Sequence, residues 1–295
     1  MSVPDYYPYR TAAMKEEYLA HYDAVAQKEW PMPSETRMAP TTHGSTFVRI
    51  NGPADAPPLM LLPGAGATSL MWTRNIQALS REFRTYAVDQ VGELGRSTCQ
   101  QPFRNLDDLI VWLDELITAL GLQGGLNLMG LSYGGALTAQ YALRHPQRVN
   151  KAVLLAPGAT VYRLSLEFAA RMVLVVVNSR KFLPKLVDWM FEDAARVDPQ
   201  WLRETMVELS YNMNVMQPRK TPIPPVVKDE QWQELRVPTL FLVGEHETIY
   251  PAEKAVRRMR RVAPRMTSEV IPGAGHDLHV AQPDLVCRRI VEFLR

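Results

Sequence analysis

The chain has 295 residues, of which 46% are hydrophobic and 22% are charged, proportions typical of a soluble globular enzyme with one large domain or two. Acids and bases are interleaved and the formal net charge is only +2, which excludes an extended basic surface for nucleic acid. Cys99 and Cys287 lie far apart in the sequence, so we expect them to be reduced, with no disulfide and no metal site.

No segment of the chain is expected to enter a membrane. Residues 1–18 lack the apolar core of a secretion signal. The most apolar run, residues 172–177, ends at Asn178, Arg180 and Lys181 and is far too short to span a bilayer. We therefore expect a cytoplasmic protein without a membrane partner.

In chain order, the apolar pattern predicts one N-terminal helix and then strands that alternate with helices. Residues 11–28 have apolar residues at helical spacing, and Pro31 and Pro33 end that helix. Residues 34–50 predict two strands joined at His43 and Gly44. Six further strands are predicted at residues 59–62, 84–88, 126–131, 153–155, 239–243 and 268–271, with helices at 72–79, 107–120, 136–144 and 284–294.

Short apolar strands alternating with amphipathic helices indicate an α/β protein with a mostly parallel, eight-stranded sheet covered on both faces. The alternation breaks between Gly158 and Val237, where helical patterns at 164–177, 183–195 and 201–211 precede a proline-rich return at 218–225. An insertion after the sixth strand lies where such sheets bind ligands, so we interpret it as a helical cap. The predicted domains are a helical extension (1–33), a core (34–157 and 238–295) and a cap (158–237).

The most informative motif is the pentapeptide at residues 130–134, which has the form G-x-S-x-G. It lies between a predicted strand and a predicted helix, the context in which a serine is held on a tight turn at the edge of a sheet. The flanking Gly130 and Gly134 allow neighbouring backbone to approach closely. We interpret Ser132 as a nucleophile.

A serine hydroxyl needs a neighbouring base to remove its proton. Of the six histidines, His276 follows the last predicted strand in a glycine-containing loop, at the same sheet edge as Ser132. We therefore favour His276 as the base, with a structural loop histidine as the alternative. The other histidines are expected at a helix end (His145), on the surface (His21 and His43), in the loop of the acid (His246) and just beyond the base (His279).

The base needs a carboxylate that fixes its tautomer. Glu247 lies three residues after Gly244, the end of a predicted strand, where a loop can turn back toward His276. Glu245 is the main competitor, and the remaining alternative is that both carboxylates are surface residues. Asp277 is disfavoured because adjacent side chains in a loop seldom face one another. The order Ser132, Glu247, His276 matches neither chymotrypsin-like nor subtilisin-like proteases.

The strand at 59–62 ends in a loop, residues 63–66, that contains Gly64 and Gly66. Such a loop can direct a backbone N–H toward the nucleophile, so Ala65 is a candidate oxyanion donor together with the N–H of Tyr133. The alternative is that the glycines serve only a tight turn.

These features together resemble the α/β-hydrolase family, with the serine turn, late acid, late histidine and 63–66 loop in family order. Within it the chain is most similar to bacterial carboxylesterases of the naproxen-esterase kind, through its N-terminal helix and the acid loop at 244–247 followed by Tyr250. Residues 89–92 and 95–97 are also similar to a structural loop of the family. The resemblance spans residues 11–295. The chain departs from the family pattern at two positions. It has Pro63 where many relatives have histidine, and Glu247 where most have aspartate.

The resemblance implies a serine carboxylic-ester hydrolase that forms an acyl-enzyme, acts on small to medium apolar esters, and needs no cofactor or metal. Epoxide hydrolases and dehalogenases of this fold use an aspartate nucleophile, so Ser132 argues against both. Acyltransferases, carbon–carbon bond hydrolases and cofactor-free haloperoxidases use the same triad and stay open, as does a ligand receptor that has kept the fold. The expected partner is a small-molecule ester.

The predicted cap is rich in methionine and other apolar residues. Two roles are open for them: lining a permissive pocket for apolar esters, or packing the cap onto the core, which we favour for each residue taken singly. They are Leu164, Phe168, Met172, Leu174, Met190, Phe191, Met206, Met213 and Met216.

Overall fold

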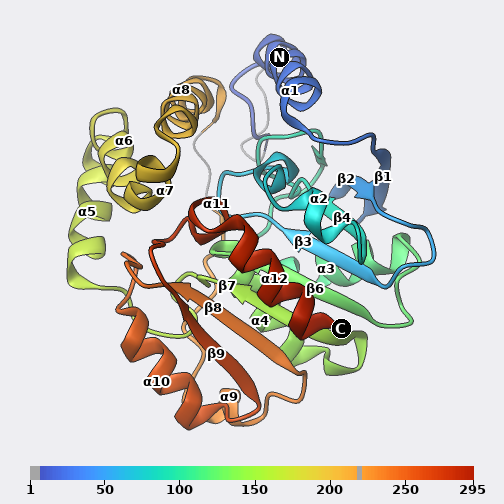
Figure 1. Ribbon diagram of the computed structural model, residues 1–295. Helices are drawn as coiled ribbons and strands as arrows, with labels where there is room; N and C mark the ends of the chain where they lie inside the picture. The colour runs from blue at the N-terminus through green and yellow to red at the C-terminus, as the bar shows by residue number, and fades with distance from the viewer. Residues whose placement is uncertain (1–6, 218–220) are drawn as a thin grey trace.

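The computed structural model describes residues 7–217 and 221–295. Within these residues eight strands form one hydrogen-bonded path at the centre of the molecule (Figure 1), and a two-residue strand, β5 (Thr98–Cys99), pairs with β2. In spatial order the path is β1 (Glu35–Thr41), β2 (Gly44–Asn51), β4 (Arg84–Val88), β3 (Pro58–Leu62), β6 (Leu126–Leu131), β7 (Val149–Leu155), β8 (Thr239–Gly244) and β9 (Met266–Ile271).

The pairs β1–β2 and β2–β4 are antiparallel, and every pair from β4 across to β9 is parallel. This arrangement confirms the predicted α/β fold with a mostly parallel, eight-stranded sheet. β5 was not anticipated because two residues are too short to show an apolar alternation.

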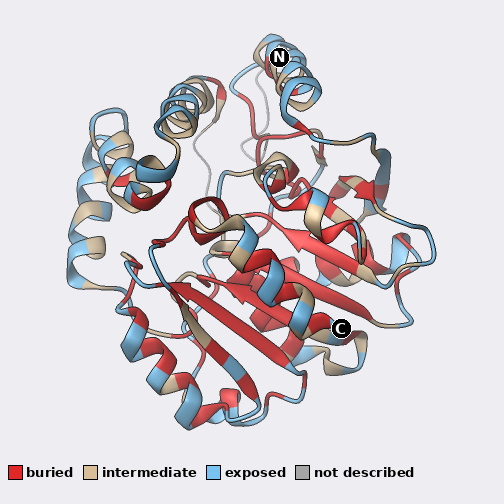
Figure 2. Ribbon diagram, viewed as in Figure 1, coloured by how far each residue is buried: buried red, intermediate tan, exposed pale blue. Residues whose placement is uncertain are grey.

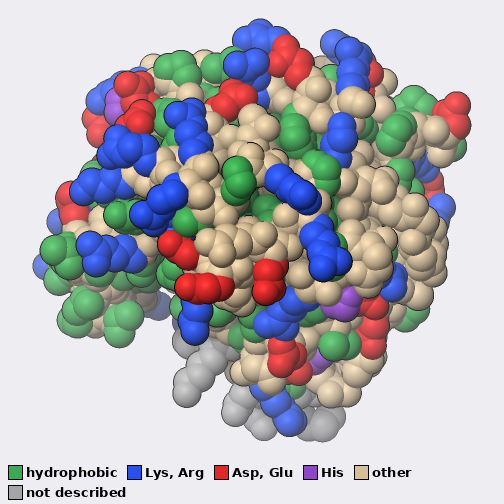
Figure 3. All heavy atoms as spheres, turned by 90° about the horizontal axis from the view of Figure 1, so that it is seen from below, with side chains coloured by type: hydrophobic (Ala, Val, Ile, Leu, Met, Phe, Trp, Pro, Cys, Tyr) green, Lys and Arg blue, Asp and Glu red, His purple; other side chains and the backbone are tan. Residues whose placement is uncertain are grey.

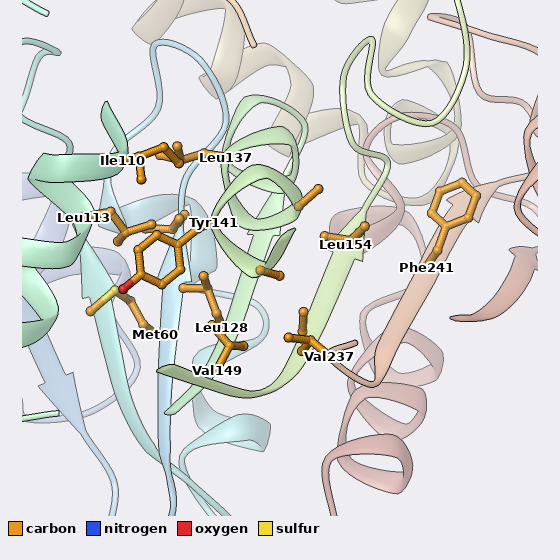
Figure 4. Packing of buried hydrophobic residues seen from close by; sticks show 14 of the residues in the cluster. Met60, Ile110, Leu113, Leu128, Leu137, Tyr141, Val149, Leu154, Val237 and Phe241 are labelled. Carbon is orange, nitrogen blue, oxygen red and sulfur yellow. The ribbon is translucent and has the colours of Figure 1, made fainter. Parts of the chain in front are cut away.

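One face of the sheet packs against α3 (Leu106–Ala119), α4 (Tyr133–Arg144) and α10 (Ala252–Val262). Figure 4 shows strand residues Met60, Leu128 and Leu154 on this side, with Leu113 and Tyr141 from the helices. Each fully buried aliphatic side chain of this kind stabilises the fold by roughly 1.5–3 kcal/mol.

The side chains at the neighbouring positions of these strands point to the opposite face of the sheet. Leu61, Met129 and Val153 pack there against η1 (Ser69–Trp72), α2 (Ile76–Leu79), α11 (Leu278–Ala281) and α12 (Pro283–Leu294). Because both faces are covered, every residue of β6 and β8 is buried (Figure 2). A strand buried on both sides is predominantly apolar, which is the pattern that identified these strands in the sequence.

The predicted N-terminal helix is α1 (Ala12–Glu29). It is capped by Thr11, whose side chain accepts a hydrogen bond from the Met14 N–H. Its buried residues are Tyr18 and Tyr22, one turn apart. The Tyr22 hydroxyl lies 3.0 Å from Ser69 Oγ and donates to Asp89 Oδ1 at 3.3 Å. Residues 1–6 of the predicted extension lie outside the described residues.

Between β7 and β8, four helices lie beyond the carboxyl ends of the parallel strands (Figure 1): α5 (Leu166–Val177), α6 (Ser179–Met190), α7 (Glu192–Val197) and α8 (Pro199–Val215). The pattern at 183–195 had predicted one helix, but it divides at Phe191, where the backbone leaves the helical region (φ −113°, ψ 26°). The segment that leads from α8 back to β8 contains α9 (Asp229–Gln233). Residues 218–220 of this segment lie outside the described ranges.

The connection from α4 to β7 contains a short 3₁₀ helix, η2 (Pro146–Arg148). In the parts of the chain that the structure describes, none of the helices combines the length and the apolar character needed to cross a bilayer.

Candidate active site

Ser132 lies at the junction of β6 and α4 in a backbone conformation that L-residues rarely adopt (φ 52°, ψ −113°). Such a conformation costs on the order of 1–3 kcal/mol and persists only where the surroundings enforce it. Here the Ser132 N–H donates to the Leu155 carbonyl at 2.9 Å, and the Ser132 carbonyl accepts from the Gly158 N–H at 3.0 Å. These bonds hold the serine at the carboxyl edge of β6 and β7.

The glycines around Ser132 are required by close backbone contacts. A Cβ atom on Gly130 would lie 2.2 Å from the Gly134 carbonyl carbon, and one on Gly134 would lie 2.3 Å from the Leu62 carbonyl oxygen. Neither space admits a side chain. The tight turn predicted from the pentapeptide is therefore present, and α4 begins directly against the end of β3.

His276 and Glu247 are in contact and buried. His276 Nδ1 lies 2.9 Å from Glu247 Oε2 and 3.1 Å from Oε1. The side chain of His276 is 4% exposed and that of Glu247 is 0% exposed. Their loops, which follow β9 and β8, are joined because the His246 N–H donates to the Ala274 carbonyl at 2.9 Å.

The competing acid, Glu245, has a different contact. Its carboxylate accepts from the Gly273 N–H at 3.0 Å and remains largely exposed. Glu247 Oε1 accepts instead from the Ile249 N–H at 2.8 Å, which orients the carboxylate toward His276. Of the two glutamates, only Glu247 reaches the histidine.

Burial and charge act in opposite directions on His276. Burial by itself lowers the pKa of the imidazole, but the negative charge of Glu247 and its hydrogen bond raise it more, with a further contribution from Asp277. The net pKa of His276 is therefore raised above its ordinary value of 6.5. Glu247 thus stabilises the imidazolium form of His276.

Ser132 follows β6, whereas Glu247 and His276 follow β8 and β9, so all three residues lie at the carboxyl edge of the parallel sheet. Among the described residues, the Ser132 hydroxyl makes no hydrogen bond to His276. In sites without substrate this contact is often long and tightens only when substrate binds.

The loop after β3 lies against the serine turn. A Cβ atom on Gly64 would be 3.7 Å from Ser132 Cβ, and the turn closes where the Ala67 N–H donates to the Gly64 carbonyl at 3.1 Å. Within the described residues, the N–H groups of Ala65 and Tyr133 have no acceptor. Tyr133 opens α4, where helical N–H groups lack intrahelical partners.

The side chain of Tyr133 ties the returning chain to the serine turn. Its hydroxyl donates to the Pro222 carbonyl at 2.8 Å, and Gln140 Nε2 donates to the Pro225 carbonyl at 3.4 Å. Burial, followed by the charge of Glu93, raises the pKa of Tyr133, so its hydroxyl stays a neutral donor. The sequence offered no signal for this contact because it joins residues far apart in the chain.

A second set of contacts that the sequence did not indicate joins α7 to the loops that follow β8 and β9. Asp277 Oδ2 accepts from the Ala194 N–H at 2.9 Å, and Asp193 Oδ2 lies 2.9 Å from His246 Nδ1. Both aspartates are buried. Burial raises the pKa of Asp277 to about 6, and Asp193 adds to the effect.

Of the other histidines, one lies in a different environment from the one that the sequence predicted. His43 was predicted on the surface, but it is buried, because its ring packs on Phe103 at a centroid distance of 4.5 Å. His145 ends α4, as predicted. His279 is buried beside Trp72, and burial followed by the charge of His276 lowers the pKa of His279 to about 3. Cys99 and Cys287 are both free.

Comparisons with known proteins agree with this arrangement. The model of the alpha/beta hydrolase family matches residues 59–289. Carboxylesterase YbfK from Bacillus subtilis is 31% identical over 293 residues, which cover 96% of each chain.

Two crystal structures extend the comparison to the fold. Carboxylesterase CesB (YbfK) from Bacillus subtilis superposes with a TM-score of 0.85 at 29% identity, over 96% of this chain and 99% of that one. Naproxen esterase (carboxylesterase NP) from Bacillus subtilis gives 0.84 at 32% identity, over 97% and 99% of the respective chains. The chain therefore belongs to the α/β-hydrolase family, and along nearly its whole length it is similar to bacterial carboxylesterases.

Proposed function

We propose that this protein hydrolyses carboxylic esters with Ser132 as nucleophile, His276 as base and Glu247 as the acid that supports the base. That the chain is an ester-hydrolysing enzyme rests on its similarity to carboxylesterases. The roles of the three residues rest chiefly on one observation, the buried contact of 2.9 Å between His276 Nδ1 and Glu247 Oε2. A buried carboxylate on one imidazole nitrogen leaves the other free to act as a base.

In the proposed acylation step, His276 Nε2 takes the proton of the Ser132 hydroxyl as the oxygen attacks the ester carbonyl. The imidazolium that forms keeps its Nδ1–H on Glu247, whose charge stabilises it. The carbonyl oxygen becomes an oxyanion that accepts from the N–H groups of Ala65 and Tyr133, at the positive end of α4. Each such donor lowers the barrier by about 3 kcal/mol in comparable enzymes.

The tetrahedral intermediate then expels the alcohol, which receives the proton from His276, and an ester bond joins the acyl group to Ser132. In deacylation, His276 removes a proton from water as the water oxygen attacks the acyl carbonyl. The second tetrahedral intermediate expels Ser132 Oγ, which takes the proton back, and the carboxylic acid leaves. None of these steps requires a metal or a cofactor.

We further propose that residues 158–237 act as a cap over the site, residues 34–157 and 238–295 as the core, and residues 1–33 as an extension. α5–α8 lie beyond the strand ends that carry the three site residues (Figure 1). Phe168 and Met190 of this segment are partly buried against the core. Apolar side chains over a polar site favour small to medium apolar esters as substrates.

The proposal is tested by hydrolysis of p-nitrophenyl esters from acetate to decanoate by the wild type, Ser132→Ala and His276→Ala. We expect kcat/KM to fall by at least about 10⁴-fold in both variants. The chain-length profile of the wild type then measures the acyl pocket. Full activity of Ser132→Ala would contradict the proposal.

A second readout separates hydrolysis from acyl transfer. The products are analysed after addition of a short alcohol, and a hydrolase is expected to release mainly the free acid. Predominant transfer of the acyl group to the alcohol at low alcohol concentration would assign the chain to the acyltransferases instead, because the acceptor would then outcompete water at the acyl-enzyme.

A further inference from the structure

The helix α5 differs from the other long helices of the protein in having no buried residue. It lies at the outer edge of the molecule (Figure 1), and Figure 2 shows it without a buried position. Leu166 is 91% exposed, Val173 62% and Val177 75%. With Ala170 these residues recur at spacings of four, three and four, so they form one apolar stripe along the helix.

The outward direction of this stripe is fixed by contacts on the other side of the helix. The Ser165 N–H donates to the Ile249 carbonyl at 2.7 Å, and its hydroxyl donates to the Thr248 carbonyl at 3.0 Å. Phe168 packs against the core, and the Arg171 guanidinium lies 4.2 Å from the centroid of the Trp189 ring in α6. The stripe is therefore a surface of the folded protein.

Basic residues border the end of the stripe. Residues 163–190 contain five Lys or Arg and two Asp or Glu, a net charge of +3, whereas the whole chain carries +2. Arg180, Lys181 and Lys185 are exposed at the start of α6, and no acidic side chain in the described part of the chain pairs with them. In Figure 3, hydrophobic and basic side chains lie together at the left edge, the side on which α5 and α6 lie in Figure 1.

We propose that the apolar stripe of α5 and the basic start of α6 form a surface that docks on an anionic lipid bilayer. The stripe would lie at the boundary of headgroups and acyl chains, with the three cations against lipid phosphates. A helix of 12 residues is too short to span a bilayer but suits this parallel position. A second copy of the chain fits less well, because a two-fold interface would bring the same cations face to face.

This proposal revises the expectation that no membrane takes part. That expectation rested on the absence of a signal core and of a bilayer-spanning run, and the apolar residues of the insertion were expected in a pocket or against the core. The structure instead leaves Leu166, Val173 and Val177 in solvent. Because the surface does not include Ser132, His276 or Glu247, docking and ester hydrolysis can be tested separately.

The experiment is flotation of the full chain with phosphatidylcholine vesicles, with and without phosphatidylglycerol. We expect the wild type to float with the anionic vesicles at low ionic strength and to be released by salt. The double variant Val173→Glu with Val177→Glu should lose at least about tenfold in vesicle partition, because two charges replace inserted valines. Lys181→Gln and Lys185→Gln should each reduce partition roughly fivefold.

Two exposed residues elsewhere provide matched controls. Val111→Glu in α3 introduces the same charge at a half-exposed valine, and Arg257→Gln removes an exposed base from the basic helix α10. Both should leave partition unchanged, and all variants should keep wild-type hydrolysis of soluble p-nitrophenyl acetate, which verifies folding.

Four results would overturn the proposal. The wild type could fail to float with anionic vesicles at low ionic strength. The double variant in α5 could float as well as the wild type, or Arg257→Gln could lose as much partition as Lys181→Gln, which would move the binding surface to α10. Sedimentation could show a dimer that the double variant lacks, which would assign the stripe to a second copy.

Discussion

At the scale of single residues, the chemistry of the site depends on how Glu247 and His276 share a buried environment. Burial disfavours the imidazolium, but the charge and hydrogen bond of Glu247, with a further contribution from Asp277, outweigh that effect and raise the pKa of His276. The neutral imidazole is the form that can accept a proton from Ser132. As the pH falls, His276 with its raised pKa becomes protonated at a higher pH than an unperturbed histidine would. Activity on the acid side is therefore lost at a higher pH.

The first prediction concerns Glu247→Gln. The amide cannot stabilise the imidazolium, so we expect kcat to fall by about 10³–10⁴-fold with a small change in KM. In the wild type, kcat/KM should decline as pH falls through the raised pKa of His276. In the variant that acid limb should move to lower pH, because burial then acts without the opposing charge.

The measurement is kcat/KM against pH for the two proteins, with circular dichroism to show that the variant is folded. Glu245→Gln is the matched control, since Glu245 contacts the Gly273 N–H and not the histidine. An unchanged acid limb in Glu247→Gln, or an equal shift in the control, would remove Glu247 from the proposed triad.

At the scale of elements, the site is held together by the close approach of β3, β6 and α4. Gly134 allows the start of α4 to lie directly against the carbonyl of Leu62 at the end of β3. The same contact brings the loop of Gly64 and Ala65 to the serine. The geometry of the proposed oxyanion donors is therefore set by backbone packing.

The second prediction follows for Gly134→Ala. A Cβ atom 2.3 Å from a backbone oxygen must push α4 away from β3, which should lower the unfolding temperature and reduce kcat by at least about 10²-fold through loss of an oxyanion donor. Gly124→Ala is the control, because a Cβ atom there has no neighbour within 4 Å. Equal activity of the two variants would show that the contact does not position the site.

The third prediction concerns α7, which is anchored through Asp277. The folded-state pKa of Asp277 is about 6, against 3.8 for the free side chain. The folded state therefore binds this proton more tightly than the unfolded chain does, and stability falls as pH rises from about 4 to 6. Above that window the buried charge costs on the order of 1–3 kcal/mol.

Asp277→Asn keeps an acceptor for the Ala194 N–H and removes the charge. We expect it to be more stable than the wild type at pH about 8, with the difference vanishing near pH about 4. Asp277→Ala also removes the charge but leaves the Ala194 N–H without its acceptor, so it should be about 1–3 kcal/mol less stable than Asp277→Asn at both pH values. Thermal unfolding at the two pH values provides the measurement, and an Asn variant that is less stable than wild type at pH about 8 would contradict the assignment.

At the scale of the whole molecule, α1 connects the N-terminal region to the loops behind the site. The Tyr22 hydroxyl contacts Ser69 in η1 and Asp89 after β4. Asp89 also accepts from the N–H groups of Ser69 at 2.7 Å and Arg96 at 2.9 Å. Three distant segments thus meet at one buried carboxylate, whose pKa is raised by burial.

The fourth prediction is that Tyr22→Phe lowers the free energy of unfolding by about 1 kcal/mol and leaves kcat/KM for soluble esters close to that of the wild type. Tyr86→Phe is the control, because its hydroxyl makes no hydrogen bond among the described residues. Denaturant titration of both variants gives the comparison. Equal stabilities would show that the hydrogen bonds of the Tyr22 hydroxyl make no net contribution to stability.

The sequence predicted the parallel sheet and the positions of Ser132, Glu247 and His276, because each depends on a local pattern at the end of a buried strand. It did not predict that α7 binds the loop of Asp277, that His43 is buried against Phe103, or that the stripe of α5 faces solvent. These features depend on contacts between segments far apart in the chain. An apolar helical pattern shows which residues share a face but not what that face meets.

The most direct test of the proposed triad is reaction with an alkyl fluorophosphonate, followed by mass spectrometry of the digested protein. An activated serine displaces fluoride and retains the phosphonyl group, so the wild type should carry one such group on the peptide that contains Ser132. His276→Ala should react at least about 10³-fold more slowly, because no base activates the hydroxyl. Phosphonylation at another residue, or an unlabelled wild type that still hydrolyses esters, would contradict Ser132 as the nucleophile.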